Sequence, residues 1–264
     1  MEQRRSNERA VGSSNDRARP SHRVTPMPNR PSPALLRDRS AEGRLLARPS
    51  TTAAARAAAP GLHSLGLARD RDALLYIPAS YRAHHAAPLA VMLHGAGGVA
   101  QHGISLVEAL ADAAGLVVLA PPSRRQTWDV ILGAFGPDIA FVDEALAATF
   151  ERCAIDPKRM ALGGFSDGAS YALSLGLTNG DLFTHVIAFS PGFMAPAHQV
   201  GAPRIYISHG IHDAVLPIDR CSRRLVPILE HAGYDVKYHE FDGAHTIPPD
   251  IAREAVEWLV PRAD

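Results

Sequence analysis

The sequence predicts an α/β protein in which a mainly parallel sheet carries helices on both faces. Short apolar runs alternate with stretches whose apolar residues recur at helical spacing, and glycine-rich turns follow several of the runs. The 264 residues, 46% of them hydrophobic, suffice for one large core. The charges balance at 27 basic and 27 acidic residues, so no nucleic-acid partner is expected. No apolar run is long enough to predict a membrane span.

The strands are expected at the short runs rich in aliphatic residues. Most runs are continuously apolar, which is typical of central strands buried on both faces, whereas the last one alternates and suits a sheet edge. The expected strands are Leu74–Ile77, Leu89–Leu93, Leu116–Ala120, Met160–Gly163, His185–Phe189, Arg204–Ser208 and Val236–Phe241. Between them, residues such as Ile139, Val142 and Leu146 fall at helical spacing and predict helices that pack on the sheet.

Residues 1–60 differ in composition from the rest of the chain. They contain twelve Arg, no Lys and five acidic residues, a net charge of +7, together with seven prolines. Such a segment buries too little apolar surface to offset the entropy of ordering, so we expect a disordered tail over residues 1–60 and one folded domain over 61–264. No apolar segment of signal-peptide length follows Arg4 and Arg5, and a cytoplasmic protein is therefore expected.

A candidate nucleophile lies in the segment Gly164-Phe165-Ser166-Asp167-Gly168. This segment follows an expected strand and opens a run of helical spacing, which is the strand-turn-helix context of a nucleophile elbow. Glycines are required on either side of such a sharp turn because side chains there would collide with the neighbouring strand and helix. The pattern predicts that Ser166 is a nucleophile exposed at the sheet edge.

A base and an acid are expected on later loops of the same edge. His245 follows the last strand in a glycine-containing turn, where its imidazole would take the proton of Ser166. Asp213 follows the strand before it and would orient that imidazole. The rival bases are His209, His212 and His239, and the rival acids are Asp219 and Asp242. His209 and His212 form a His-x-x-His pair, but no third ligand at compatible spacing completes a metal site.

The turn His94-Gly95-Ala96-Gly97-Gly98 suits an oxyanion hole. Negative charge on a carbonyl oxygen under attack is stabilised by preorganised backbone N–H groups, and small residues let these approach a ligand. The expected donors are Ala96 and Asp167, the residue after the nucleophile. A phosphate-binding turn is the alternative, but it would require a Gly-x-Gly-x-x-Gly spacing that is missing here.

A family resemblance rests on four segments, His94–Gly98, Cys153–Arg159, Gly164–Ser170 and Ser208–Pro217. They resemble the phospholipase/carboxylesterase branch of the α/β hydrolases and its polyhydroxybutyrate-depolymerase and feruloyl-esterase-like relatives. The resemblance covers roughly Asp70 to Val260 and implies that the expected domain over 61–264 is an α/β-hydrolase catalytic domain that cleaves carboxylic esters without a cofactor. Ser166, Asp213 and His245 match the triad positions.

The chemistry expected is acyl-enzyme formation on small or medium acyl esters, with a small-molecule ester as the partner. The alternatives are a polyester depolymerase, a lysophospholipase-type esterase, an amidase or peptidase with the same triad, and a non-catalytic binding protein of the same fold. The oligomeric state is left open. Cys153 and Cys221 have no metal-ligand spacing and are expected to be buried thiols.

The expected substrate pocket is an open cleft. The segment between the fifth and sixth expected strands, residues 190–203, is too short for a lid domain. The pocket candidates are Trp128, Phe193 and Leu216, which lie on loops at the carboxyl edge of the sheet. Family members often carry Gln, Ala or Asn after the nucleophile, whereas Asp167 here adds a carboxylate that would disfavour anionic acyl groups.

Overall fold

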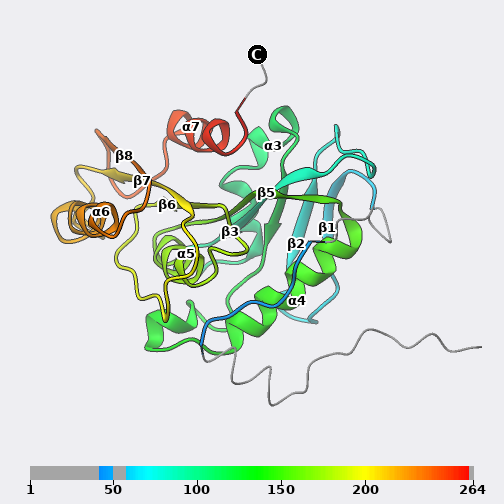
Figure 1. Cartoon of the computed structure of the whole chain (residues 1–264), viewed down its shortest axis with the longest axis horizontal. Coiled ribbons are helices and arrows are strands. Elements are labelled where there is room, and N and C mark those ends of the chain that lie inside the picture. The colour runs from blue at the N-terminus through cyan, green and yellow to red at the C-terminus, as the bar shows by residue number, and fades with distance from the viewer. Residues whose placement is uncertain (1–41, 50–57, 262–264) are drawn as a thin grey trace, which may run out of the picture. The chain divides into compact units, whose positions relative to one another are not determined.

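The computed structural model describes residues 42–49 and 58–261. Their centre is an eight-stranded sheet with the strand order β1-β2-β4-β3-β5-β6-β7-β8 (Figure 1). β2 pairs antiparallel with β1 and β4, and every other neighbouring pair is parallel. The strands are β1 (Gly61–Ser64), β2 (Leu74–Ile77), β3 (Ala87–Leu93), β4 (Val117–Ala120), β5 (Ile155–Phe165), β6 (His185–Phe189), β7 (Arg204–Gly210) and β8 (Val236–Phe241). The predicted α/β class with a mainly parallel sheet is confirmed.

The strand at the antiparallel edge, β1, was not expected from the sequence. Its four residues contain a single aliphatic side chain, Leu62, and alternate between intermediate and exposed positions. Such a short, polar edge strand carries almost no periodic signal, and its pairing with β2 decides its conformation. The central strands were easier to predict because all residues of β3, β4 and β6 are buried.

The helices cover both faces of the sheet and divide the core into two clusters. The helices α4 (Pro137–Arg152), α5 (Asp167–Thr178) and α6 (Ser222–His231) pack on one face. The helices α2 (Ala100–Ser105), α3 (Glu108–Ala114) and α7 (Pro249–Leu259) pack on the other. Two short 3-10 turns, η1 (Asp129–Leu132) and η2 (Ile218–Arg220), lie in the connecting loops. None of the described helices combines the length and apolarity that crossing a bilayer requires.

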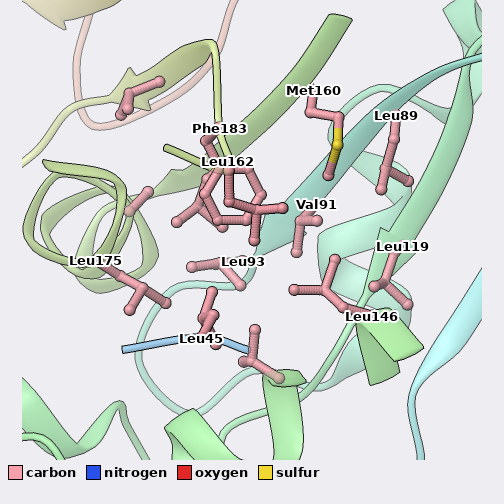
Figure 2. Close-up of a cluster of buried hydrophobic side chains, with 14 of the residues drawn as sticks. Leu45, Leu89, Val91, Leu93, Leu119, Leu146, Met160, Leu162, Leu175 and Phe183 are labelled. Atoms are coloured by element: carbon pink, nitrogen blue, oxygen red, sulfur yellow. The ribbon is translucent and has the colours of Figure 1, made fainter. Parts of the chain in front are cut away.

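Residues 42–49 form a strap that corrects the expected tail. Leu45 is fully buried and belongs to the same cluster of side chains as Leu93 and Leu175, on the face of the sheet that α4 and α5 cover (Figure 2). Its amide donates to Asn179 Oδ1 at 2.9 Å. The amides of Leu46 and Ala47 donate to Asp143 Oδ1 at 2.7 and 2.8 Å.

Ion pairs also anchor the strap, because Arg44 and Arg48 both contact Asp181 Oδ2, at 2.8 and 2.7 Å. The expectation of disorder is therefore wrong for residues 42–49. It is also wrong for 58–60, where the Ala58 amide bonds to the Arg152 carbonyl. The average composition of residues 1–60 does not show that one leucine, Leu45, can be buried and that the neighbouring backbone amides can donate to side chains of the folded domain. Residues 1–41 and 50–57, the rest of the expected tail, lie outside the described part of the chain.

The topology brings the candidate site residues to one edge of the sheet. β3, β5, β7 and β8 are parallel, so the residues that follow their carboxyl ends meet at the same edge. His94 follows β3 and Ser166 follows β5, while Asp213 lies on the loop after β7 and His245 on the loop after β8.

Candidate active site

Ser166 occupies a strained turn between β5 and α5. Its backbone has φ +58° and ψ −119°, a conformation that side-chain-bearing residues rarely adopt. The Ser166 amide donates to the Phe189 carbonyl at 2.9 Å, and the Ser166 carbonyl accepts the amides of Ala169 and Ser170 in the first turn of α5. A Cβ at Gly164 would lie 2.5 Å from the Gly168 backbone, and one at Gly168 would lie 2.3 Å from the Leu93 oxygen. The two glycines are therefore needed for the turn to pack.

Asp213 and His245 form a hydrogen-bonded pair. His245 Nδ1 lies 2.6 Å from Asp213 Oδ2, which leaves Nε2 free to accept a proton. The amides of Val215 and Leu216 donate to Asp213 Oδ1 at 2.9 and 2.8 Å. Burial alone would raise the pKa of the Asp213 carboxyl, but the Leu216 amide and His245 outweigh burial and hold this pKa below its ordinary value. Asp213 is thus an ionised, fully hydrogen-bonded partner for the imidazole.

Phe165 connects the elbow to the imidazole, since its ring centroid lies 4.5 Å from that of His245. The hydrogen bonds of the described residues include the His245–Asp213 bond but none between Ser166 Oγ and His245. Hydrogen bonds of this kind are often long in ligand-free structures and shorten when substrate binds.

His209, which the sequence offered as a rival base, lies behind Asp213 instead. It is fully buried, and its Nε2 is 2.8 Å from the Leu216 carbonyl and 3.3 Å from Asp213 Oδ2. Ser222 Oγ lies 2.6 Å from its Nδ1. Since the Leu216 carbonyl can only accept, Nε2 carries the hydrogen and Nδ1 accepts from Ser222. Burial lowers the pKa of His209, so the ring is neutral and fixes the loop that holds Asp213.

The remaining rivals lie apart from this pair. His212 contacts Asp242 at 3.0 Å, and both side chains are largely exposed. Asp219 pairs with Arg223, and His239 pairs with Glu254. No group of His, Cys, Asp and Glu within the described ranges has the geometry of a metal site. Cys153 and Cys221 are free and buried, as expected, and burial raises the pKa of the Cys153 thiol to about 12.

The glycine-rich turn after β3 lies against the elbow. A Cβ built at Gly95 would be 3.5 Å from Ser166 Cβ. The Ala96 amide donates none of the hydrogen bonds recorded for the described residues, and the Asp167 amide belongs to the first turn of α5, where helical N–H groups lack intrahelical partners. Both expected oxyanion donors are therefore available to a ligand.

Buried polar side chains hold this turn in place. His94 Nε2 accepts the Ser123 amide at 3.0 Å, and burial lowers the pKa of His94 to about 4, so the ring stays neutral. Arg71, itself at φ +54°, donates to the carbonyls of Ser123 and Gly98 at 2.7 and 2.8 Å. Arg71 could not be identified from the sequence, because a single arginine before β2 has no motif around it.

Trp128 corrects the expected pocket. Its side chain is fully buried, stacks on Tyr171 at 4.8 Å and donates from Nε1 to the His94 carbonyl at 2.9 Å. The sequence alone does not show whether a tryptophan on a loop lines a pocket or lies in the core. Trp128 lies in the core and supports the glycine-rich turn from there. The neighbouring Thr127 donates to Asp167 Oδ2 at 2.5 Å, so the carboxylate after the nucleophile is tied to the same loop.

Phe193 and Leu216, the other pocket candidates, lie on adjacent loops. Phe193 is partly buried against the α5 face, and a Cβ at Gly192 would lie 3.3 Å from Leu216 Cδ2. A cavity of about 620 Å³ opens elsewhere, beside His245, between the α2–α3 segment and α7. Neither Phe193 nor Leu216 lines it.

An eight-stranded, mainly parallel sheet with a strained serine elbow and a buried Asp–His pair at its carboxyl edge is the architecture of an α/β hydrolase. The sequence profile of the phospholipase/carboxylesterase family matches residues 115–260. The chain belongs to this family, as its motifs suggested.

Similar proteins include esterases. The chain is 28% identical over 168 residues to a probable feruloyl esterase C of Aspergillus flavus and 29% identical to that of Aspergillus oryzae, and covers 60% of the length of each. Esterase PE8 has a TM-score of 0.58 at 26% identity, over 70% of this chain and 95% of that one. A phospholipase/carboxylesterase from Dyadobacter fermentans has a TM-score of 0.53, also at 26% identity, over 66% of this chain and 90% of that one. Each of these similar proteins is named as an esterase or carboxylesterase, and the chain spans about 60% of the length of the two Aspergillus relatives.

Proposed function

We propose that the chain is a serine carboxylic ester hydrolase that forms an acyl-enzyme on Ser166. The observation that supports this most is the 2.6 Å bond between His245 Nδ1 and the buried Asp213 carboxylate, beside an elbow that holds Ser166 at φ +58°. In this proposal Asp213 fixes the tautomer in which His245 Nε2 is unprotonated and ready to act as a base.

The reaction follows from these positions. His245 Nε2 takes the hydroxyl proton while Ser166 Oγ attacks the ester carbonyl carbon, and the oxyanion accepts the amides of Ala96 and Asp167. The C–O bond to the alcohol then breaks, and His245 gives its proton to the departing oxygen. Water, deprotonated by the same imidazole, attacks the acyl-enzyme and releases the acid.

The proposed substrates are small or medium acyl esters. Relatives named feruloyl esterase make hydroxycinnamate esters a specific class to include. The chain spans about 60% of the length of those relatives, so their substrate is a hypothesis for this chain. An amidase would hydrolyse anilides as well as esters of the same acyl group. Nitrophenyl esters and nitroanilides of one acid separate these two activities.

The test of the nucleophile is fluorophosphonate labelling of the full chain. Ser166→Ala should abolish the label and lower ester turnover by several orders of magnitude without unfolding the protein, because the covalent step is lost. Ser80→Ala, an exposed serine away from the sheet edge, is the matched control and should label and turn over as the wild type does. Label on another serine, or turnover retained by Ser166→Ala, would show that the proposal is wrong.

A further inference from the structure

The cavity beside His245 has a mainly apolar lining. Leu106 and Leu110 line it from the α2–α3 segment, and Ile247 and Ala252 from the base loop and α7. Phe165 and His245 complete the wall nearest the elbow. A volume of about 620 Å³ lies within the range of pockets that bind small molecules. The cavity is thus large enough for a substantial part of a substrate.

The position of the cavity relative to the candidate site indicates which part of an ester would occupy it. Its lining includes His245, but of the described residues that would hold the acyl carbonyl, Ser166, Ala96 and Asp167, it includes none. In the proposed reaction the acyl group is bonded to Ser166, whereas the departing oxygen must lie within hydrogen-bond reach of His245. The alcohol side of the ester therefore points toward the wall that carries the imidazole.

We infer that this cavity is the binding site for the leaving alcohol and that the alcohol it takes is apolar and carries no positive charge. The inference rests on the proposed function and goes further by naming the alcohol class. The mainly apolar walls favour alkyl or aryl alcohols over a sugar, because besides His245 only Ser105, Thr246 and Arg253 among the lining residues have polar side chains, too few to replace the water around several hydroxyl groups. Arg253 is the positively charged side chain among the lining residues, and no carboxylate lines the cavity.

The first experiment varies the alcohol while the acyl group stays acetate. We expect kcat/KM to rise from methyl to butyl to hexyl acetate, by up to about fourfold for each methylene that is buried. Ala109→Trp tests the cavity directly, because Ala109 is exposed and lines it, so bulk can be added without disturbing the core. This variant should lower the ratio of hexyl to methyl acetate kcat/KM about tenfold.

The control is Ala113→Trp, which adds the same bulk at an exposed position one turn further along α3 that does not line the cavity. It should keep the wild-type ratio. A second series, the methyl esters of acetate, butanoate and hexanoate, varies the acyl group and should respond equally in both variants. If Ala109→Trp changes the acyl series and leaves the alcohol series alone, or changes neither, the assignment to the leaving alcohol is wrong.

Acyl transfer gives an independent test. Nitrophenyl butanoate serves as the acyl donor, and an added alcohol competes with water for the acyl-enzyme. If the cavity binds the alcohol side of an ester, it should also bind this acceptor alcohol, so 1-hexanol should react with the acyl-enzyme better than methanol at equal concentration. Ala109→Trp should remove that preference. Equal interception by the two alcohols in the wild type would contradict the inference even if Ser166 is labelled and active, which separates its failure from a failure of the proposed function.

The inference that the alcohol carries no positive charge is tested with acetylcholine and its uncharged isostere, 3,3-dimethylbutyl acetate. We expect at least about tenfold higher kcat/KM for the isostere, because Arg253 disfavours a second cation in an apolar cavity. Arg253→Gln should narrow the difference. Equal or faster hydrolysis of acetylcholine would overturn the exclusion of positive charge.

Discussion

Asp213 and Asp129 are both buried carboxylates on loops of this domain, yet their environments have opposite effects on their charge. Asp213 accepts two backbone amides and the His245 imidazole, and its pKa lies below the ordinary value. Asp129 also accepts two amides, from Gly136 and Asp138, at 2.8 and 2.9 Å. Burial and the neighbouring Asp138 carboxylate nevertheless raise the pKa of Asp129 to about 6.

The comparison shows that burial alone does not decide the charge of a carboxyl group, because burial favours the neutral form at both sites and only at Asp213 do the neighbouring groups outweigh it. The two sites have similar backbone donors. Asp213 also contacts the imidazoles of His245 and His209, whereas at Asp129 burial has the largest effect and the Asp138 carboxylate adds to it. A negative charge at Asp213 would stabilise a protonated His245 during turnover. A negative charge at Asp129 opposes folding.

The largest effect is expected at Asp213. Asp213→Asn preserves the shape of the side chain but removes the charge and allows the wrong imidazole tautomer, so kcat for a short ester should fall about 10⁴-fold at pH 7. Asp242→Asn is the matched control, because Asp242 is exposed and pairs with His212. Steady-state kinetics of both variants test the difference. If both variants lose the same fraction of kcat, Asp213 is not the acid that orients His245.

The next effect concerns stability at Asp129. The pKa of Asp129 is raised from 3.8 to about 6 in the folded state, so between these pH values the folded state binds more protons than the unfolded state. The free energy of unfolding therefore falls as pH rises from about 4 to about 6. The loss is about 3 kcal/mol for a shift of this size. Asp129→Asn can still accept both amides, which bond to the same oxygen, and should remove this loss. Urea unfolding at pH 4, 5, 6 and 7 tests it, and identical pH profiles for wild type and variant would contradict it.

A third carboxylate, Asp143, extends the comparison to the strap. It resembles Asp213 in accepting two consecutive backbone amides, those of Leu46 and Ala47. Asp143→Ala leaves these amides without their acceptor and should lower the free energy of unfolding by about 2 kcal/mol. Glu144→Ala, at the adjacent exposed position of α4, is the control. If the two variants unfold at the same urea concentration, the strap adds little to the stability of the domain.

The smallest effect is expected at His209, a positioning residue for Asp213. His209→Asn should lower kcat/KM about tenfold, because its amide is too short to replace Nε2 as the donor to Leu216 and Asp213. With one donor fewer, Asp213 stabilises the imidazolium more strongly, so the acidic limb of the kcat/KM profile should move up by as much as about one pH unit. His209→Gln, which restores a donor at this reach, should recover much of the activity. An unchanged pH profile in both variants would mean that His209 only fills space.

Local patterns were sufficient to predict the central part of the fold. The apolar runs of β3, β4 and β6 are buried on both faces, and the helices that pack on them have regular apolar spacing, so the α/β class follows from periodicity. The edge strand β1 and the Leu45 strap could not be predicted in this way. Each depends on pairing or burial against residues far along the chain, such as Asn179 for the strap.

The sequence by itself determined the fold class, the family and the residue types proposed for the chemistry, because the glycines at 164 and 168 and the chain order of Ser166, Asp213 and His245 can be identified without knowing any contact. Tertiary structure decided the rest. It brought Asp213 to His245, placed His209 behind that pair, put Trp128 in the core and opened a cavity beside the imidazole. These features depend on contacts that the sequence does not record, such as the one between Asp213 and His245, 32 positions apart, and on burial, which affects both pKa and access to solvent. A sequence pattern records residue types and spacing, whereas these distances are fixed only when the strands assemble into one sheet.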